Sequence, residues 1–347
     1  MDATPILNGE YEHPIHMDVE LSTKCNLRCR FCHLDYFDPK EWTQFSLKDF
    51  ERTIGPALPH LNSITLFNKF EALTCRDFLP IFNFVAGHGI ETYFSTNGLL
   101  LNDEIIDQVV GRLNFLTVSV TGFTSESYRL NMGFNGLMIL KDNLTKLRAV
   151  KAQRNTDLPR LRISTVGMLD TIDELSLAVD FAKKHQAEEG VQLTSFKAHG
   201  ESLVPLMPMS NPKLYTRMTE NALAYAKKME VRLTLQSGSL AENKSQTQAL
   251  GHRFCDIPWR RLSIQPDGEV YPCPMAYAPI ASLAEMSIKE IWDSAALAAF
   301  RAGVNDHENM NEDCLKCTHC RHRSLVDPEV NDFSKASTYP TGMVRKR

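Results

Sequence analysis

The chain has 347 residues, of which 43% are hydrophobic and 23% charged, enough to bury a core in one large or two moderate domains. The formal net charge is −4, and lysines and arginines are mixed with acidic residues along the chain, which argues against nucleic acid as a partner. Residues 1–24 lack the basic start and apolar centre of a signal peptide, and no apolar run is long enough to span a bilayer. We therefore expect a cytoplasmic protein that does not bind membranes.

Short apolar segments alternate with amphipathic ones from about residue 16 to 245, which predicts β/α units around a parallel sheet. The predicted strands are His16–Ser22, Ser63–Phe67, Glu91–Ser95, Phe115–Thr121, Arg160–Val166 and Val191–Ser195, with Arg232–Gln236 as a further edge. The predicted helices include Asp77–His88, Glu104–Arg112, Met138–Lys151 and Ile172–His185. We expect an α/β fold, a partial barrel of six β/α units, with its chemistry in the loops that follow the strands.

Three cysteines, Cys25, Cys29 and Cys32, follow the first predicted strand in the string CNLRCRFC. Three thiolates can hold three irons of a [4Fe–4S] cluster and leave the fourth iron open to a small chelating molecule. A zinc knuckle is the alternative, but zinc prefers four ligands, and His33 is poorly placed to complete a tetrahedron with Cys32 next to it. The spacing favours the cluster.

The string, including Phe31 before the last cysteine, resembles the CxxxCxxC signature of radical S-adenosylmethionine (SAM) enzymes. The resemblance implies a partial (β/α)6 radical SAM barrel. It also implies that SAM chelates the open iron, that an electron from the cluster cleaves it to a 5′-deoxyadenosyl radical, and that this radical abstracts a substrate hydrogen. Flavodoxin or ferredoxin would be the external electron donor.

The same resemblance implies SAM contacts after the next strands. Glu71, in the loop Asn68-Lys69-Phe70-Glu71-Ala72, stands where the family has a GGEP-like loop, although the glycines and the proline are absent. Further contacts are implied for the end of the third strand, the end of the fourth and the helix after it, at Ser95, Thr96, Asn97, Ser119 and Arg129. Turn chemistry alone would also explain the Asn-Gly and Thr-Gly pairs.

Cys75 follows Glu71 at the predicted start of a helix with Thr74 as its cap, and a helix amino terminus lowers the pKa of a thiol. It is a candidate hydrogen donor to a substrate radical, and a buried apolar side chain is the alternative. Polar residues at later strand ends are candidates for substrate contact: Lys197, His199, Glu201 and Gln236. They could equally be ordinary surface groups.

A polar, turn-rich segment near residue 237 predicts a boundary before a cysteine-rich module. We therefore divide the chain into a lead of residues 1–15, a barrel of 16–245, a module of 246–325 and a tail of 326–347. In that module, the residues from Cys255 to Cys273 read as a hairpin with a turn at Pro266-Asp267-Gly268, which would bring these two cysteines together.

The second set of cysteines resembles the SPASM domain of radical SAM enzymes, with Gly268 ahead of Cys273 and a connector at Leu283–Trp292. Full versions hold two auxiliary clusters and need more cysteines. The resemblance implies one auxiliary [4Fe–4S] cluster, with Cys320 spare, substituting as a ligand or donating hydrogen, and with four ligands: Cys255, Cys273, Cys314 and Cys317. Zinc is the alternative, because His319 and His322 lie among these cysteines.

Radical SAM enzymes with such modules modify peptides or small molecules. The reduced cysteine set resembles the single-auxiliary-cluster enzymes that oxidise, epimerise or dehydrate a hydroxylated carbon of a sugar, cyclitol or aminoglycoside-like natural product, and we expect this activity first. The alternative is a peptide maturase that acts on a ribosomal natural product or a sulfatase. A non-catalytic zinc protein is a remote third reading.

Overall fold

The structure is a computed structural model that describes residues 11–32, 42–196, 198, 200–235, 255–306, 308–315 and 317. The chain forms two compact units. The described residues of the first are 11–25, 42–95 and 255–317, and those of the second are 26–32 and 96–235, apart from the positions outside the description.

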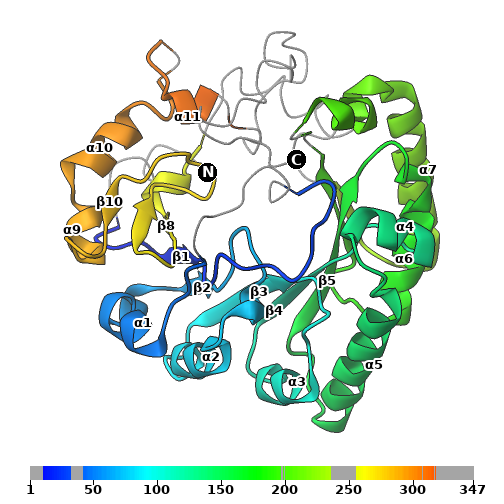
Figure 1. Cartoon of the computed structure of the whole chain (residues 1–347), viewed down its shortest axis with the longest axis horizontal. Helices are drawn as coiled ribbons and strands as arrows, with labels where there is room; N and C mark the ends of the chain where they lie inside the picture. Colours follow the sequence, from blue (N-terminus) through cyan, green and yellow to red (C-terminus); the bar gives the residue numbers. More distant parts are fainter. Residues whose placement is uncertain are drawn as a thin grey trace. The chain divides into compact units, whose positions relative to one another are not determined.

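In the first unit, the strands follow the order β10-β9-β8-β1-β2-β3. β1 pairs in parallel with β2 and with β8, and β2 pairs in parallel with β3, whereas β8-β9 and β9-β10 are antiparallel. The strands are β1 His16–Val19, β2 Ser63–Thr65, β3 Glu91–Thr96, β8 Arg261–Ile264, β9 Glu269–Tyr271 and β10 Ala281–Ser282. Segments from opposite ends of the sequence thus lie side by side (Figure 1).

Six α-helices or single turns accompany this sheet, and α1 and α2 lie along one side of β1–β3 (Figure 1). They are α1 Leu47–Thr53, α2 Phe78–Ala86, α9 Ile288–Trp292, α10 Ala295–Ala302 and α11 Glu312–Leu315, with the 3₁₀ helices η3 Gly55–His60, η4 Ala72–Thr74 and η8 Ile257–Trp259. Local capping explains several starts: Ser46 accepts a hydrogen bond from the Asp49 amide at α1, and Ser287 and Glu290 form a capping box at α9.

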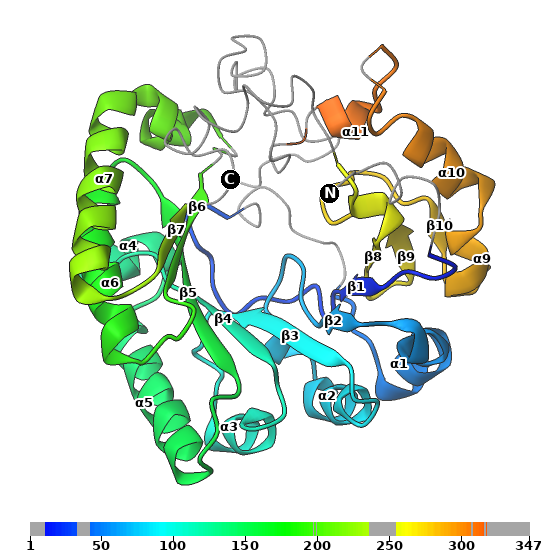
Figure 2. The same cartoon turned by 180° about the vertical axis from the view of Figure 1, so that it is seen from behind.

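The second unit contains four parallel strands in the order β4-β5-β6-β7. They are β4 Phe115–Ser119, β5 Arg160–Gly167, β6 Val191–Ser195 and β7 Leu233–Leu235. The helices α5, α6 and α7 cover one face of these strands (Figure 2). The helical segments are α3 Asp103–Val109, α4 Ser125–Met132, α5 Leu137–Gln153, α6 Leu175–Lys184 and α7 Pro212–Met229, with η5 Ile172–Glu174, η6 Glu201–Leu206 and η7 Pro208–Ser210.

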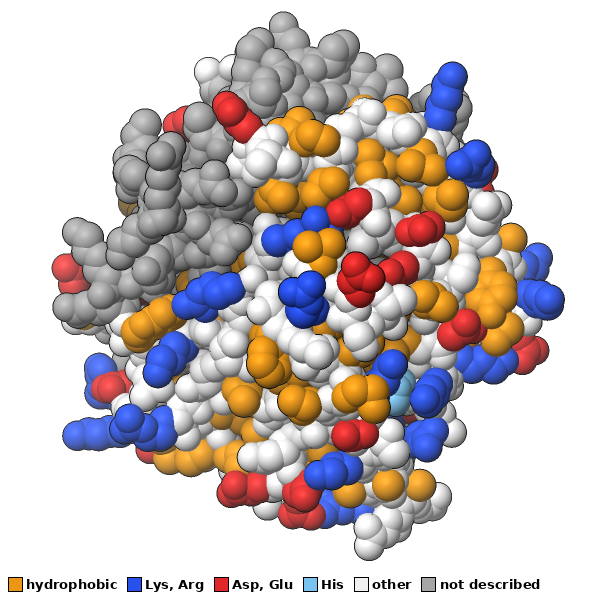
Figure 3. Space-filling view, turned by 45° about the vertical axis from the view of Figure 1, so that its right-hand side comes forward, with side chains coloured by type: hydrophobic (Ala, Val, Ile, Leu, Met, Phe, Trp, Pro, Cys, Tyr) orange, Lys and Arg blue, Asp and Glu red, His pale blue; other side chains and the backbone are white. Residues whose placement is uncertain are grey.

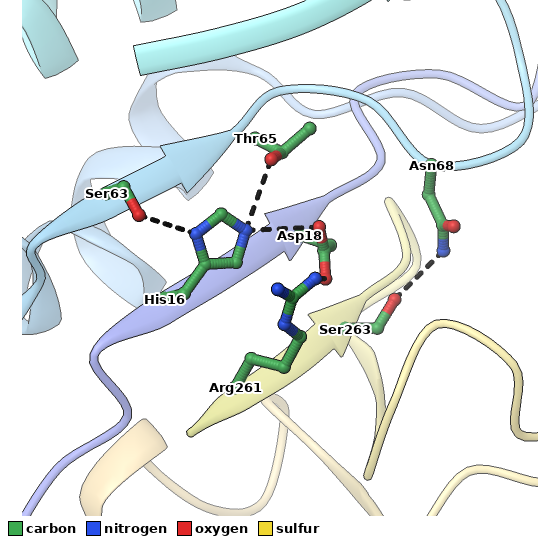
Figure 4. A network of polar contacts seen from close by, with 7 residues as sticks. All are labelled: His16, Asp18, Ser63, Thr65, Asn68, Arg261 and Ser263. Atoms are coloured by element: carbon green, nitrogen blue, oxygen red, sulfur yellow. Dashed lines mark hydrogen bonds and ion pairs between the residues drawn. The ribbon is translucent and has the colours of Figure 1, made fainter. Parts of the chain in front are cut away.

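The two faces of β1 show how the sheet separates apolar and polar side chains. Met17 and Val19 are fully buried, and each contributes about 1.5–3 kcal/mol by leaving water. His16 and Asp18 point to the opposite face, as the period of two in a strand requires. There His16 is hydrogen-bonded to Ser63 at 2.7 Å, and Arg261 on β8 pairs with Asp18 at 3.3 Å (Figure 4).

The predicted strands and helices are confirmed in existence and order, and the predicted hairpin is confirmed by the antiparallel pair β8-β9. Its turn needs Gly268, whose φ of 89° lies in the left-handed region. The segment predicted as one helix, Ile172–His185, begins instead as the 3₁₀ turn η5 before α6. The predicted boundary near residue 237 lies outside the described residues.

Basic and acidic side chains are interspersed among apolar ones on the face shown in Figure 3. Among the helices of the described stretches, none combines the length and the apolar character that crossing a membrane requires.

Candidate functional site

The loop with the first three cysteines follows β1 and crosses the division of the chain: Cys25 lies in the first unit and the rest of the loop in the second. The amide of Cys32 donates to the carbonyl of Cys29 at 2.9 Å, which makes a tight turn. The Cys29 thiol lies 3.8 Å from the carbonyl oxygen of Met132 at the end of α4. All three cysteines are partly exposed, so their sulfurs are accessible to a ligand.

The end of α4 supports this loop through specific contacts. Arg30 donates from Nε to the Asn131 side-chain oxygen at 2.7 Å, and its guanidinium pairs with Asp170 at 2.6 Å. Gly133 ends α4 with a φ of 75°, and a Cβ placed there would lie 2.4 Å from the carbonyl oxygen of Arg28. Only glycine allows the loop to approach the helix this closely.

Two buried polar atoms on α4 lack a hydrogen-bond partner among the described residues: the Tyr128 hydroxyl and the Asn131 side-chain nitrogen. Both side chains are fully buried. Burial raises the pKa of Tyr128, and the charge of Cys29 acts in the same direction, so the hydroxyl and this thiol share one environment. Unpartnered donors next to a cysteine ligand fit a site that receives a further polar group, such as the sulfides of a cluster.

Asn97 connects the turn after β3 with the cysteine loop. Its side-chain nitrogen donates to the side-chain oxygen of Asn26 at 2.7 Å, and its oxygen accepts from the Leu99 amide at 3.0 Å. The Thr96 hydroxyl accepts from the Gly98 amide at 3.0 Å. Turn chemistry therefore operates here as expected, and it also places Asn97 beside the loop.

The other predicted SAM contacts have more open surroundings. Ser95 on β3 and Ser119 at the end of β4 are half-buried. Arg129 lies in the last turn of α4 and is exposed. Their assignment to SAM stays a prediction.

Glu71 is buried and lies beside the start of the cysteine loop. Its amide donates to the carbonyl of Lys24 at 3.2 Å, directly before Cys25. One oxygen of its carboxylate accepts from the Leu73 amide at 3.3 Å and so caps η4. Glu71 therefore has a structural task in this loop beside the predicted contact with SAM.

Glu20, at the end of β1, is an acidic residue that the sequence reasoning missed. It is fully buried, and its Oε2 accepts from the amides of Lys69 and Phe70. Burial raises its pKa to about 7, although the amide hydrogen bonds lower it. A glutamate in an otherwise apolar strand, five residues before Cys25, was the signal available in the sequence.

Cys75 differs from its prediction in its local structure. Helix α2 begins at Phe78 with Asp77 as its N-cap, so Cys75 does not start a helix, and the Thr74 hydroxyl donates to the Glu71 carbonyl instead of capping α2. The Cys75 thiol is buried and donates to the Phe45 carbonyl at 3.5 Å. Burial raises the pKa of this thiol to about 11, against the predicted lowering, and only the Asp77 amide opposes the rise.

The structure brings the four predicted auxiliary ligands together in the first unit. Burial raises the pKa of the Cys273 thiol to about 12, the charges of Cys317, Cys255 and Cys314 act in the same direction, and a hydrogen bond from the Met275 amide opposes them. Thiols that repel one another in this way ionise together only when cations compensate them. Four convergent cysteines are a donor set that fits a [4Fe–4S] cluster.

The backbone around these thiols is well held. Asn305 accepts from the Cys255 amide at 2.8 Å and donates to its carbonyl at 2.9 Å, and the Cys317 amide donates to the Cys314 carbonyl at 3.2 Å. In the part of the chain that the structure describes, no three His, Cys, Asp or Glu side chains are arranged to hold a single metal ion. In a four-iron cube each cysteine binds its own iron, so the thiols need not converge on one point as zinc ligands do.

Four predicted residues lie outside the described residues: Lys197, His199, Gln236 and Cys320. Glu201 begins η6 and is exposed. The predicted contacts of these residues with substrate, and the roles of Cys320, stay predictions.

Residues 255–320 match the model of the SPASM family, an iron–sulfur cluster-binding domain. An uncharacterized protein of Methanocaldococcus jannaschii is 30% identical over 130 residues, which are 37% of this chain and 42% of that protein, so the match spans less than half of the relative. An AdoMet-dependent heme synthase of Methanosarcina barkeri is 22% identical over 92% of this chain and 94% of the relative.

Solved structures have a similar fold. SuiB of Streptococcus suis bound to the precursor peptide SuiA has a TM-score of 0.66 and 16% identity, over 92% of this chain and 72% of SuiB. The protein anSMEcpe with bound AdoMet and the Kp18Cys peptide has a TM-score of 0.65 and 17% identity, over 89% of this chain and 88% of that chain. At these identities the similarity concerns the fold.

Proposed function

We propose that this chain, which the SPASM match, the heme synthase relative and the shared fold support as a radical SAM protein with a SPASM domain, is an enzyme that cleaves SAM reductively and removes a hydrogen atom from its substrate. The observation that supports this most is the SPASM match, because it contains all four of the cysteines that the structure brings together. The three-cysteine loop after β1 adds the second cluster site.

Each cofactor has a set of residues that fits it. Cys25, Cys29 and Cys32 would hold the first [4Fe–4S] cluster, and the Cys273 set would hold the auxiliary one. When bound, the first cluster supplies the electron for SAM cleavage and the auxiliary cluster supplies an acceptor for an electron from the substrate.

The residues around the loop keep the first site in place. Arg30 joins the loop to α4, and Asn97 joins it to the turn after β3. Glu71, next to Lys24, offers a carboxylate that suits the ammonium group of SAM. We expect a ferredoxin or flavodoxin in the cytoplasm to deliver the electron.

A peptide is the substrate class that we favour. SuiB was solved with a precursor peptide and anSMEcpe with the Kp18Cys peptide, and both folds extend over about nine tenths of this chain. The predicted sugar or cyclitol substrate stays a prediction that none of these similarities supports. The heme synthase relative, which aligns over 92% of this chain, makes a heme precursor the second candidate.

The decisive experiment measures 5′-deoxyadenosine by mass spectrometry after anaerobic reconstitution with iron, sulfide, SAM and dithionite. The intact chain should form it, whereas Cys25→Ala, Cys29→Ala and Cys32→Ala should each abolish it, because a cluster with only two thiolate ligands does not hold SAM on an open iron. Circular dichroism of each variant checks that the fold persists. Undiminished cleavage by any of the three would contradict the assignment.

The same assay ranks the substrate classes. Peptides, sugars and heme precursors are added in turn, and the class that increases 5′-deoxyadenosine formation and loses a hydrogen is the substrate. Stimulation by sugars alone would overturn the preference for a peptide.

A further inference from the structure

The loop after β2 is joined directly to the hairpin that leads to Cys273. The Asn68 side chain donates to the Ser263 hydroxyl on β8 at 2.9 Å (Figure 4). Ser263 is the register partner of Tyr271 on β9, and Cys273 follows two residues later. The predicted SAM loop and the auxiliary site therefore share one framework inside the first unit.

Lys69 is the charged residue of this loop, and its ammonium group is directed to the hairpin. The ammonium nitrogen lies 5.9 Å from the centre of the Tyr271 ring, within the range of a cation–π contact. The side chain is exposed, yet desolvation lowers its pKa, so it lies in a concave space lined by protein atoms. The charges of Glu20 and Cys273 oppose this lowering, which places both within electrostatic reach of the ammonium.

We propose that Lys69 is a positioning residue for charge at the auxiliary site: its ammonium stabilises the reduced form of the cluster that Cys273 helps to hold, and so raises the reduction potential of that cluster. The inference rests on the auxiliary cluster of the proposed function. Reduction adds one electron, and hence one negative charge, to the cluster. A fixed positive charge beside a ligand favours this form, all the more where burial limits screening by water.

This role gives the sequence of the loop a meaning. Lys69 and Phe70 occupy positions where the resemblance expected glycines, so this chain places a cation there instead of bare backbone. In the proposed reaction the raised potential helps the site to accept one electron from the substrate radical, which then loses a proton to become a neutral product.

The test is a potentiometric titration of the auxiliary cluster, followed by electron paramagnetic resonance. The parent is the full chain with Cys25, Cys29 and Cys32 replaced by alanine, so that the signal comes from the auxiliary site alone. Lys69→Met removes the charge at similar length, and Lys69→Arg keeps it. Lys48→Met, at an exposed lysine of α1, is the matched control for loss of one positive charge.

We expect Lys69→Met to shift the midpoint potential to a more negative value, and Lys69→Arg and Lys48→Met to stay near the parent. Equal potentials for Lys69→Met and the parent would overturn the role of Lys69. If Lys69→Met takes up no cluster, Lys69→Gln replaces it, and the same potential for Lys69→Gln and Lys69→Arg would overturn the proposal. A parent that binds no cluster at all would instead contradict the auxiliary centre itself.

Discussion

A single buried carboxyl, Glu20, organises the loop after β2. One of its oxygens accepts two consecutive amides, from Lys69 and Phe70, and the other has no partner among the described residues. Full burial makes the charged form costly, which raises the pKa of Glu20 to about 7. Near neutral pH this residue therefore changes its charge inside the core of the first unit.

The stability of the chain should depend on pH through Glu20. Its pKa rises from 4.5 in the unfolded chain to about 7 in the folded one, so the folded state holds the proton more tightly. The contribution is full below pH 4.5 and is lost as the pH rises through 7, a loss of up to about 3 kcal/mol. Glu20→Gln, which stays neutral, should remove this loss.

The measurement is the free energy of unfolding in urea, for both proteins, at several pH values between about 5 and 8. The intact chain should lose stability relative to Glu20→Gln as the pH rises. Parallel pH profiles for the two proteins would mean that Glu20 does not titrate in this range.

At the scale of elements, helix α4 forms the support for the cysteine loop. It begins with a capping box between Thr124 and Ser127 and ends at Gly133 in the left-handed conformation. Its last turn contacts Arg30 through Asn131 and approaches Cys29 through Met132. The position of the loop thus depends on where this helix ends.

Gly133→Ala should therefore impair the first cluster site. A Cβ would lie 2.4 Å from the Arg28 carbonyl oxygen, so the loop must move. Gly89→Ala is the matched control, because Gly89 also has a positive φ, of 71°, but no atom lies within 4 Å of its Cβ position. Both variants should lose about 1–2 kcal/mol of stability from the backbone conformation.

Iron analysis of reconstituted protein separates the two effects. Gly133→Ala should bind about half of the iron of the intact chain, because only the auxiliary site stays filled, while Gly89→Ala should bind the full amount. Full iron in Gly133→Ala would refute the close approach as a requirement for the cluster.

At the scale of the whole molecule, cysteines from both ends of the described chain serve two separate sites. The first set lies in one short loop, whereas the second combines Cys255, the hairpin and the segment of α11. β8 aligns with β1 in parallel register, His16 opposite Arg261, although nearly 250 residues separate them. The predicted α/β fold with a radical SAM barrel and a SPASM module is confirmed by the shared fold and by the family match.

Because the two sites use different cysteines, SAM binding and auxiliary iron should separate cleanly. SAM at a hundredfold excess over its dissociation constant should stabilise the intact reconstituted chain by about 2.7 kcal/mol. The chain with Cys25, Cys29 and Cys32 replaced by alanine should keep its auxiliary iron and show no such gain. Thermal unfolding with and without SAM, together with iron analysis, checks this, and a variant that loses all of its iron would contradict two separate sites.

The sequence by itself determined what depends on local pattern. Alternating apolar periods predicted strands such as β6 at their observed bounds, and Pro266-Asp267-Gly268 predicted the hairpin turn. The spacing of cysteines predicted both candidate metal sets, because a short loop restricts which ligands meet.

Only the tertiary structure decided what depends on contacts between distant segments. Burial, rather than a helix terminus, controls Cys75; Glu20 became an organising residue because the loop of Lys69 and Phe70 places two amides on it. The seat of Arg28 on Gly133 likewise joins parts that are remote in sequence. Such features follow from desolvation and close packing, which depend on which surfaces meet, and no local period in the chain encodes that.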